Sequence, residues 1–554
     1  MTHDAQDSPA PNTASAVTGP VGGASDTAPE MSWFAWGDPD QAAELDPATR
    51  DLISQVLRTR TEDMPPVAEE DVSLPDPRLA ERLRDALSEV VGAEHVRTDA
   101  PTRLRHSGGK STPDLLARRS GRADLAPDAV LFPADHDQVE RLLALCSAER
   151  VAVVPFGGGT SVVGGLTPVS GDFPVVVSLD LRRLDRLVSL DVTSLTAVLG
   201  AGVRTPHAEA MLAEHGLTLG HMPQSFEYAT IGGYAATRSS GQASSGYGRF
   251  EDMVMGMRVA TPRGTLELGG PPASAAGPDL RRLMVGSEGT LGVITEVAVR
   301  VRPRPERVLD EAWSFPDYTT GVTALRALAQ SDVRPTMARL SDETETFVNA
   351  ALGGREATPG CQAVLGFEGT EAEVAARAAT VHEVMVTAGG SPLGSDPVAH
   401  WRENRFSAPY LRDTLLSAGI LAETLETAAT WSDLLPLYRA VVGALTDALD
   451  DDVSGVVVLC HVSHTYPTGA SLYFTVATGA GEDPSARWAG AKRAASDAIV
   501  ANGGTITHHH AVGTDHRPWM TAELGPLGAE VLRAVKSALD PEGVLNPGKL
   551  IPDA

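Results

Sequence analysis

The chain has 554 residues, more than one compact core usually holds, and this length predicts two or three domains. Its 72 acidic residues outnumber its 45 basic residues, and the net charge of −27 argues against nucleic-acid binding as a main role. No apolar run approaches the roughly 20 residues that span a bilayer, and the three cysteines match neither a disulfide framework nor a metal-binding spacing.

Residues 1–30 are almost entirely small, polar or proline. They bury too little apolar surface to offset the cost of ordering, so they predict a disordered tail. Residues 31–120 are expected to form a helical region. Within it, LPDPRLAERLRDALSEVVG carries Leu79, Leu83 and Leu87 at helical spacing and predicts a surface helix.

A strand, a helix and a second strand follow one another from about residue 127. PDAVLF is short and β-prone, HDQVERLLALCSAE places Val139, Leu142 and Cys146 on one helical face, and VAVVPF predicts a buried strand. Such a βαβ unit implies a parallel strand pair. Further β-rich segments follow, and PRG within VMGMRVATPRGTLEL predicts a hairpin turn.

The prolines of RPRPE, near residue 303, indicate a domain boundary. We expect residues 121–305 to form the first domain. Residues 306–525, where strands and helices alternate less regularly, would form the second. The last residues, 526–554, include LDPEGVLNPGKLIP, which holds too many helix breakers for a helix and is expected to pack back on the first domain.

The segment PFGGGTSVVGG, residues 155–165, directly follows a predicted buried strand. Its glycines let the backbone approach a ligand closely, and Thr160 and Ser161 add hydroxyls that suit phosphate oxygens. It is not a dinucleotide fingerprint, because Val162 stands three positions after Gly159 and no helical pattern follows. It is not a Walker loop, because no lysine follows it. A glycine cluster alone is an ordinary turn more often than a ligand site.

Two more segments rich in small residues make a ligand groove the better interpretation. About half of PQSFEYATIGGYAATRSSGQASSGYG, residues 223–248, is glycine, alanine or serine. In VGSEGTLGVITE, small residues precede a β-prone run. Three such segments predict a long groove lined by backbone, which suits an extended cofactor with a central pyrophosphate.

With the terminal LNPGKL, these motifs resemble the FAD-binding domain of the vanillyl-alcohol-oxidase superfamily, in the same order along the chain. The resemblance implies an α+β fold, with a PCMH-type FAD-binding domain of two α+β subdomains. It also implies a cap with a mixed α/β sheet that carries the substrate site. Members with covalent FAD usually attach it through a cap residue or a histidine near the glycine loop. No histidine lies between Val151 and Leu166, so we expect non-covalent FAD.

The resemblance also implies which residues surround FAD. The glycine loop would meet the pyrophosphate, and the two later segments would line the rest of the cofactor. The expected cofactor-binding residues are Pro155, Phe156, Gly157, Gly158, Gly159, Thr160, Ser161, Gln224, Ser225, Thr230, Thr237, Arg238, Ser239, Ser240, Glu288, Gly289, Thr290, Leu291, Gly292, Val293 and Ile294.

Five further segments, SWFAWGDPD, RPTMARL, YLRD, HVSHTYPTGASLYF and GGTITHHHAVG, resemble the alkyldihydroxyacetonephosphate synthase (alkylglycerone-phosphate synthase) family. That family replaces the acyl group of an acyl-dihydroxyacetone phosphate with a fatty alcohol. The reaction is redox-neutral, belongs to ether lipid synthesis and is thought to use a flavin N5 adduct. The resemblance implies these site residues: Tyr473, His508, His509, His510 and Arg339 as catalytic, and Arg412 as the arginine that binds the substrate phosphate.

This reaction needs an acid/base group, because the ketone phosphate must lose a proton from the carbon that bears the acyl group. A phenol has an ordinary pKa of about 10. We therefore expect the histidine run to lower the pKa of Tyr473 with positive charge or to relay protons. Taken singly, a histidine run is more often an accident of a loop, and a strand tyrosine a core residue. Their joint occurrence favours the functional interpretation.

The alternative is a flavin-dependent dehydrogenase of a 2-hydroxy acid on the same fold. Such enzymes carry a stretch resembling His-x-Gly-Asp-Gly-Asn-x-His, whose histidines take part in metal or substrate binding. This chain has YPTGASLY instead, with Tyr466 and Tyr473 at its ends. A neutral phenol replaces imidazole poorly as a ligand, so we expect no metal. A non-catalytic FAD-binding protein is disfavoured, because binding alone needs no acid/base pair.

The expected partners are FAD and a small-molecule or lipid substrate, without nucleic acid. We expect a homodimer. Any contact with a membrane would be peripheral and use a local apolar patch, because the net charge of −27 disfavours electrostatic docking. The chain ends in IPDA and shows no peroxisomal import signal, so we expect a cytoplasmic protein.

Overall fold

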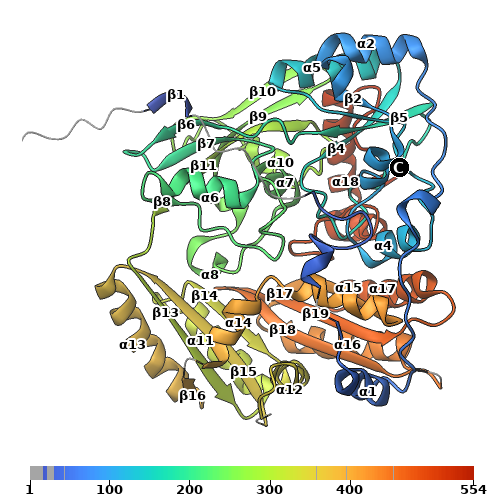
Figure 1. Cartoon of the computed structure of the whole chain (residues 1–554). Helices are drawn as coiled ribbons and strands as arrows, with labels where there is room; N and C mark the ends of the chain where they lie inside the picture. Colours follow the sequence, from blue (N-terminus) through green and yellow to red (C-terminus); the bar gives the residue numbers. More distant parts are fainter. Residues whose placement is uncertain are drawn as a thin grey trace, which may run out of the picture.

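The computed structural model describes residues 17–21, 30–42, 44–356, 359–394, 396–452 and 454–553. Figure 1 shows two stacked halves, with strands β2 to β11 in the upper half and β13 to β19 in the lower half. Helices and strands occur together in both halves, which confirms the α+β class. No helix in the described ranges is both long enough and apolar enough to cross a membrane.

A four-stranded sheet in the upper half contains the predicted strand–helix–strand unit. Its strands, in spatial order, are β2 (Val96–Arg97), β3 (Ala129–Leu131), β5 (Val175–Asp180) and β4 (Val151–Phe156). Helix α5 (His136–Ala148) connects β3 to β4, and α2 (Glu81–Val91) packs against α5. The predicted strands β3 and β4 are parallel but not adjacent, because the crossover leaves room for β5, which pairs with both.

A six-stranded sheet forms the other part of the upper half. Its strands, in spatial order, are β1 (Val17–Val21), β6 (Leu187–Asp191), β7 (Thr196–Gly200), β11 (Val293–Arg300), β9 (Val254–Thr261) and β10 (Gly264–Gly269). Strands β9 and β10 form the hairpin that PRG predicts. Apolar side chains of this sheet share a core with its helices, α6 (Thr205–Ala213), α7 (Ile231–Thr237), α9 (Phe250–Met253) and α10 (Arg281–Met284).

Strand β1 lies inside the segment whose composition predicts disorder. It pairs antiparallel with β6 at the edge of the six-stranded sheet. Valine and threonine favour extended backbone, and an edge strand supplies hydrogen-bond partners that composition does not reveal. The expectation of disorder therefore does not hold for residues 17–21. Residues 1–16 and 22–29 lie outside the described ranges.

The lower half is built on one antiparallel sheet of seven strands. In spatial order these are β16 (Ser391–Gly394), β13 (Arg307–Phe315), β15 (Cys361–Gly369), β14 (Met337–Ser341), β18 (Val456–Tyr466), β19 (Gly469–Gly479) and β17 (Ile420–Thr430). The core on one face includes residues of α11 (Tyr318–Ala329), α13 (Glu371–Thr387), α16 (Leu434–Leu449) and α17 (Pro484–Ala501). The opposite face turns toward the upper half (Figure 1).

The C-terminal residues return to the upper half. After helix α18 (Met520–Leu539), Val544 O accepts a hydrogen bond from Val153 N at 2.8 Å, and Asn546 N donates to Val153 O at 2.8 Å. Leu545 is buried in the same core as β3, β4 and β5. The chain end therefore extends the four-stranded sheet beside β4.

The remaining elements are short or border the two halves. Helix α8 (Ser244–Tyr247) of the upper half contacts β14 and β18 of the lower sheet. Helix α4 (Thr112–Arg119) contacts α17 and β17. The others are α1 (Pro47–Val56), α3 (Ala100–Arg105), α12 (Glu343–Leu352), α14 (Asp396–Asn404), α15 (Ala408–Ser417), β8 (Leu217–Thr218), β12 (Arg302–Pro303) and the 3-10 helices η1 (Pro39–Gln41), η2 (Glu69–Asp71), η3 (Ala93–His95) and η4 (Arg517–Trp519).

Candidate active site

Three side chains form a row across the face of the lower sheet that turns toward the upper half. Tyr473 of β19 pairs with Glu426 of β17 on one side and with His461 of β18 on the other. Residues directly opposite in antiparallel strands point to the same face. The rings of His461 and Tyr473 are nearly parallel, with centroids 5.0 Å apart. Glu426 and His461 are buried, and Tyr473 is half-buried.

A β-bulge adds His464 to this face. The register between β18 and β19 shifts between Val462 and His464, so that His464 pairs with Ser471. An extra residue in one strand reverses the alternation of the side chains beyond it. His464 therefore lies on the same face as His461, although an odd number of positions separates them. Ser244 Oγ, from the upper half, lies 2.6 Å from His464 Nδ1.

The loop of residues 507–510 folds over Glu426. The N–H of His508 donates to Glu426 Oε2 at 2.6 Å, and the N–H groups of His509 and His510 donate to Oε1 at 3.0 and 2.9 Å. The ring centroids of His509 and His510 lie 5.9 and 5.4 Å from that of Tyr473. The structure thus brings the histidine run and Tyr473 together, on either side of a carboxylate that the sequence did not single out.

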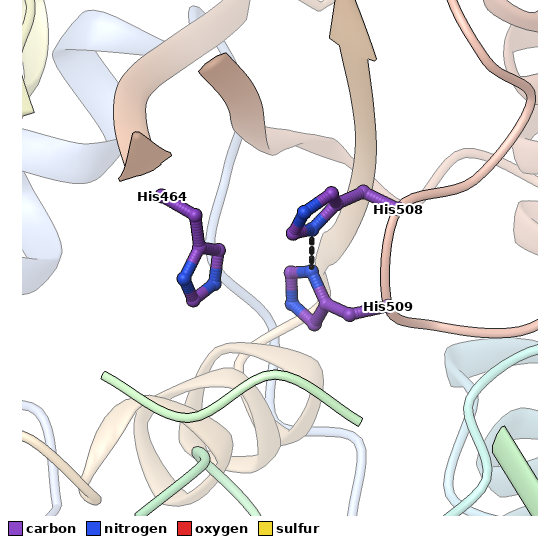
Figure 2. A group of neighbouring side chains, drawn as sticks. All are labelled: His464, His508 and His509. Carbon is purple, nitrogen blue, oxygen red and sulfur yellow. Dashed lines mark hydrogen bonds between the residues drawn. The ribbon is translucent and has the colours of Figure 1, made fainter. Parts of the chain in front are cut away.

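His508 connects the loop to its surroundings. Its Nε2 lies 2.6 Å from the Tyr466 hydroxyl, and its Nδ1 lies 2.9 Å from His509 Nδ1 (Figure 2). From the upper half, the Arg249 guanidinium donates to the His508 carbonyl at 2.7 Å. Side chains of both halves therefore fix the position of this loop.

Burial sets the protonation of the cluster. It lowers the pKa of His508 and His509, and that of His510 to about 3, so these rings are neutral at pH 7. Burial raises the pKa of Tyr473 to about 12. The expectation that charged histidines lower the pKa of Tyr473 is therefore wrong. The phenol is neutral, and so are its histidine neighbours.

The negative charge of the cluster belongs to Glu426. Burial opposes this charge, but attraction to His509, His510 and His508 whenever these rings are protonated, together with the Thr507 hydroxyl, holds the pKa of Glu426 well below its usual range. The Thr507 hydroxyl donates to Oε1 at 2.7 Å. The site thus pairs an ionised carboxylate with neutral rings.

Arg339 of β14 borders the row through His461. Its NH2 group donates to Glu345 Oε1 at 2.7 Å and lies 3.1 Å from His461 Nδ1. Burial opposes the charge of Glu345, but His461 and Arg339 lower the pKa of this carboxyl to about 2. Arg339, paired with Glu345, therefore places a positive charge beside His461, the neighbour of Tyr473.

Arg412 of α15 lies apart from this cluster. Its Nε and NH2 groups donate to Asp413 Oδ1 at 3.0 and 2.9 Å, and its NH1 group donates to the Lys110 carbonyl at 2.5 Å. Among the described residues, it makes no hydrogen bond to the histidine run or to Tyr473. These bonds leave two of its five N–H donors for a ligand.

The glycine loop after β4 offers backbone donors. In the part of the chain that the structure describes, the N–H groups of residues 158–161 donate to no protein acceptor. Successive free N–H groups make a binding site for anions. A Cβ on Gly158 would lie 1.9 Å from the Tyr228 carbonyl oxygen, and one on Gly157 would lie 2.6 Å from Thr230 Oγ1. The glycines therefore allow close packing behind the loop while its donors stay available to a pyrophosphate.

Some of the other expected cofactor-binding residues are placed where they can serve a ligand. Gln224 Nε2 is buried without a hydrogen-bond partner among the described residues. Thr230 caps α7 by accepting from the Gly233 N–H at 3.2 Å, beside the glycine loop. Ser240 Oγ lies 3.3 Å from His464 Nδ1 and so links this segment to the histidine cluster.

Other residues expected at the cofactor have different surroundings. Arg238 is exposed and pairs with Glu251. Leu291 and Ile294 are buried in the core of the six-stranded sheet, and Val293 is buried in the core of the four-stranded sheet. Alternation along β11 sends the side chains of Val293 and Ile294 into different cores, and Leu291, just before the strand, shares the core of Ile294. Their contact with the cofactor stays a prediction.

Glu288 also has a role in packing. Its carboxylate accepts hydrogen bonds from the N–H groups of Val512 and Gly513, at 2.8 and 2.7 Å. Burial raises its pKa to about 7. Glu288 therefore ties the third small-residue segment to the residues just after the histidine run.

Comparisons with known proteins identify the family. A model described as a FAD binding domain matches residues 127–269, and one described as the C-terminal domain of FAD linked oxidases matches residues 304–550. The alkyldihydroxyacetonephosphate synthase of Trypanosoma brucei brucei is 33% identical over 569 residues, which cover 94% of this chain and 92% of that protein. A solved alkyldihydroxyacetonephosphate synthase structure is 31% identical, with a TM-score of 0.81 over 94% of this chain and 99% of that one.

This chain belongs to the alkyldihydroxyacetonephosphate synthase family. It is a FAD-dependent enzyme, as the motifs predict. A structure of p-cresol methylhydroxylase with substrate bound is 15% identical, with a TM-score of 0.66 over 85% of this chain and 96% of that one. This likeness confirms the PCMH-type FAD-binding fold. The N–H groups of residues 158–161 and Gln224 Nε2, which have no hydrogen-bond partner among the described residues, fit FAD.

In this member of the alkyldihydroxyacetonephosphate synthase family, the ring nitrogens of His464, His508 and His509 lie within 4.8 Å of one another (Figure 2). Such a group has the shape of a metal site, but both ring nitrogens of His508 and the Nδ1 atoms of His464 and His509 have other partners. Ser244 contacts His464 Nδ1, Tyr466 contacts His508 Nε2, and the Nδ1 atoms of His508 and His509 face each other. A metal would have to displace these contacts, so we still predict that the enzyme needs none.

Sequence reasoning missed Glu426, His461 and His464, and noted Tyr466 only as the end of a motif. Glu426 could have been found from its place in the β-prone run ILAETLETAAT. A carboxylate that is buried inside a strand needs hydrogen-bond partners, so an acidic residue there indicates a polar site. His461 lies twelve positions before Tyr473, and it became a neighbour only through the hairpin register of β18 and β19.

Proposed function

We propose that this member of the family exchanges the acyl group of an acyl-dihydroxyacetone phosphate for a fatty alcohol, without net oxidation or reduction. The packing of the neutral Tyr473 phenol against the rings of His509 and His510 carries this proposal. A proton-handling cluster of this kind suits a substrate that must lose and regain a proton at carbon.

The residues of the cluster would divide the work. FAD, when bound, supplies the group that holds the three-carbon unit during the exchange. The neutral rings of His509 and His510 would accept the proton from the carbon that bears the acyl group. Tyr473, whose pKa burial raises to about 12, would donate a hydrogen bond or proton to the departing carboxylate oxygen, and the entering alcohol would give up its proton to a histidine ring. Arg412 would bind the phosphate with its remaining donors.

We also propose that residues 121–305 form the FAD-binding domain and residues 306–525 the cap. The strands of the seven-stranded sheet all fall within 307–479, which supports this division. FAD is held without a covalent bond in this proposal, because no histidine lies on the glycine loop between Val151 and Leu166.

A comparison of substrates tests the proposed function. Purified holoenzyme would be mixed with palmitoyl-dihydroxyacetone phosphate and hexadecanol, without an electron acceptor, and the products identified by mass spectrometry. The proposal predicts an alkyl ether product and free palmitate in equal amounts. Reduction of a dye by a 2-hydroxy acid, with no ether product, would favour the dehydrogenase alternative.

A further inference from the structure

We propose that Glu426 is a positioning residue that fixes the tautomer of His509, so that His509 Nε2 becomes the base of the exchange. The inference rests on the proposed function for the identity of the reaction. The tautomer itself follows from contacts within the chain and can be measured without turnover.

Glu426 is built into the site as a charge. The residue as a whole is only 1% exposed. It accepts from three successive backbone N–H groups, those of residues 508–510, and from the Thr507 hydroxyl. A buried carboxylate is costly unless such donors surround it, and these donors favour its ionised form. The histidine loop therefore takes its shape around a fixed negative charge.

This charge decides where His509 carries its proton. His509 Nδ1 lies 3.7 Å from Glu426 Oε2 and 2.9 Å from His508 Nδ1. An ionised carboxylate on that side favours an N–H on His509 Nδ1, which then donates to His508 Nδ1. His508 keeps its proton on Nε2, 2.6 Å from the Tyr466 hydroxyl. His509 Nε2 is left with a lone pair and makes no hydrogen bond within the described residues.

The arrangement follows the logic of a catalytic triad, in which a buried carboxylate sets the tautomer of the histidine base. Burial lowers the pKa of His509, and Glu426 raises it again. Arg249 of the upper half lowers the pKa of His509 and so opposes the effect of Glu426. The titratable and charged groups that face His509 are Glu426, Tyr473, His464, His508, His510 and Arg249. Among these, the Glu426 charge strengthens His509 as a base.

Glu426→Gln tests the inference, because it keeps the size of the side chain and removes the charge. Holoenzyme labelled with nitrogen-15 in its histidine rings would be studied by NMR. His509 should change from a proton on Nδ1 to a proton on Nε2. kcat should fall roughly 100-fold or more, as when a general base is lost, while KM changes little. Without the carboxylate, the pKa of His509 falls, so the acid limb of the kcat profile should move to lower pH.

Glu523→Gln is the matched control. Glu523 of α18 accepts from the Thr505 hydroxyl at 2.7 Å and from the Ile506 N–H at 3.1 Å, so it supports the same loop away from the histidine rings. Its pH profile and ring signals should match those of the wild type. If Glu426→Gln loses FAD, Glu426→Asp keeps the charge and should retain the wild-type tautomer and acid limb.

An unchanged His509 tautomer in Glu426→Gln, or the wild-type position of its acid limb, would overturn the inference. A changed tautomer in Glu426→Asp would overturn it as well. Failure of the proposed function looks different: the wild type would keep the Nδ1 proton on His509 but form no ether product from acyl-dihydroxyacetone phosphate and hexadecanol.

Discussion

Tyr473 is a neutral phenol in the candidate site, with aromatic rings packed around it. Burial raises its pKa to about 12, and its ring lies beside those of His461, His509 and His510. A phenol in this state can donate a proton or a hydrogen bond but is not a base at neutral pH. The resemblance pointed to this residue, and its raised pKa favours a proposed role as a donor over the base with lowered pKa that the sequence suggested.

We predict that Tyr473→Phe retains FAD and a melting temperature close to the wild type but loses at least roughly 100-fold in turnover. The substitution removes one hydroxyl and little volume, so packing against His461 persists. Turnover of acyl-dihydroxyacetone phosphate and thermal unfolding would be measured in parallel. Tyr438→Phe, which removes a partly buried hydroxyl that donates to Asp342, should keep its turnover. A stability loss with turnover retained in Tyr473→Phe would make Tyr473 a structural residue.

Among the site residues, the sequence predicted those that lie in recognisable motifs and missed those that only tertiary contacts bring to the site. Tyr473 and the histidine run stand in recognisable segments. Glu426 stands alone in a strand, and only the fold of the loop over it reveals four donors. His464 needs the bulge in β18 to reach the site face, and a bulge of this kind leaves no pattern in residue types.

The glycine loop shows how an element can serve a ligand through its backbone. Gly158 packs so closely on the carbonyl of Tyr228 that a Cβ would lie 1.9 Å from its oxygen. The sequence suggested that glycine leaves room for the pyrophosphate. The structure adds that glycine is needed for packing behind the loop, and that this packing holds the free N–H groups of residues 158–161 in place.

We predict that Gly158→Ala lowers FAD content and stability together, because the loop or the Tyr228 backbone must shift. Flavin absorbance and thermal unfolding measure both effects. In the wild type, acid precipitation should release all FAD into the supernatant. Gly490→Ala on α17, where no atom lies within 4 Å of the new Cβ, should keep FAD and stabilise by up to about 1 kcal/mol. Normal FAD content in Gly158→Ala would contradict the loop assignment.

Local patterns predicted the elements better than their order. The strand–helix–strand unit, the β9–β10 hairpin and helix α2 follow from periodicity and turn residues. The position of β5 between β3 and β4 does not, because strand order depends on which later segment fills the gap left by a crossover. The pairing of residues 544–546 with β4 is equally non-local.

The candidate site lies where the two halves of the molecule meet. Ser244 and Arg249 of the upper half reach His464 and His508, and Glu288 holds the backbone just after the histidine run. Residues of both halves thus meet at the histidine run. This arrangement explains why the motifs for cofactor and catalysis lie far apart in the sequence.

Removal of metals tests whether the histidine cluster works through protons alone. We predict that prolonged dialysis against a chelator leaves turnover unchanged, because Tyr466 and His509 already contact both ring nitrogens of His508, and Ser244 contacts His464 Nδ1. Metal analysis before and after dialysis is the control. Loss of turnover that zinc or manganese restores would instead make His464, His508 and His509 a metal site.

We propose above that this FAD-dependent enzyme exchanges groups without net electron transfer. The most direct measurement is the number of turnovers per FAD under anaerobic conditions, with acyl-dihydroxyacetone phosphate and a fatty alcohol and without an electron acceptor. We expect many turnovers, with FAD oxidised when the substrate is exhausted, because no electrons leave the reaction. A single turnover that leaves reduced FAD, followed by recovery only when an acceptor is added, would rule out the exchange and establish an oxidoreductase.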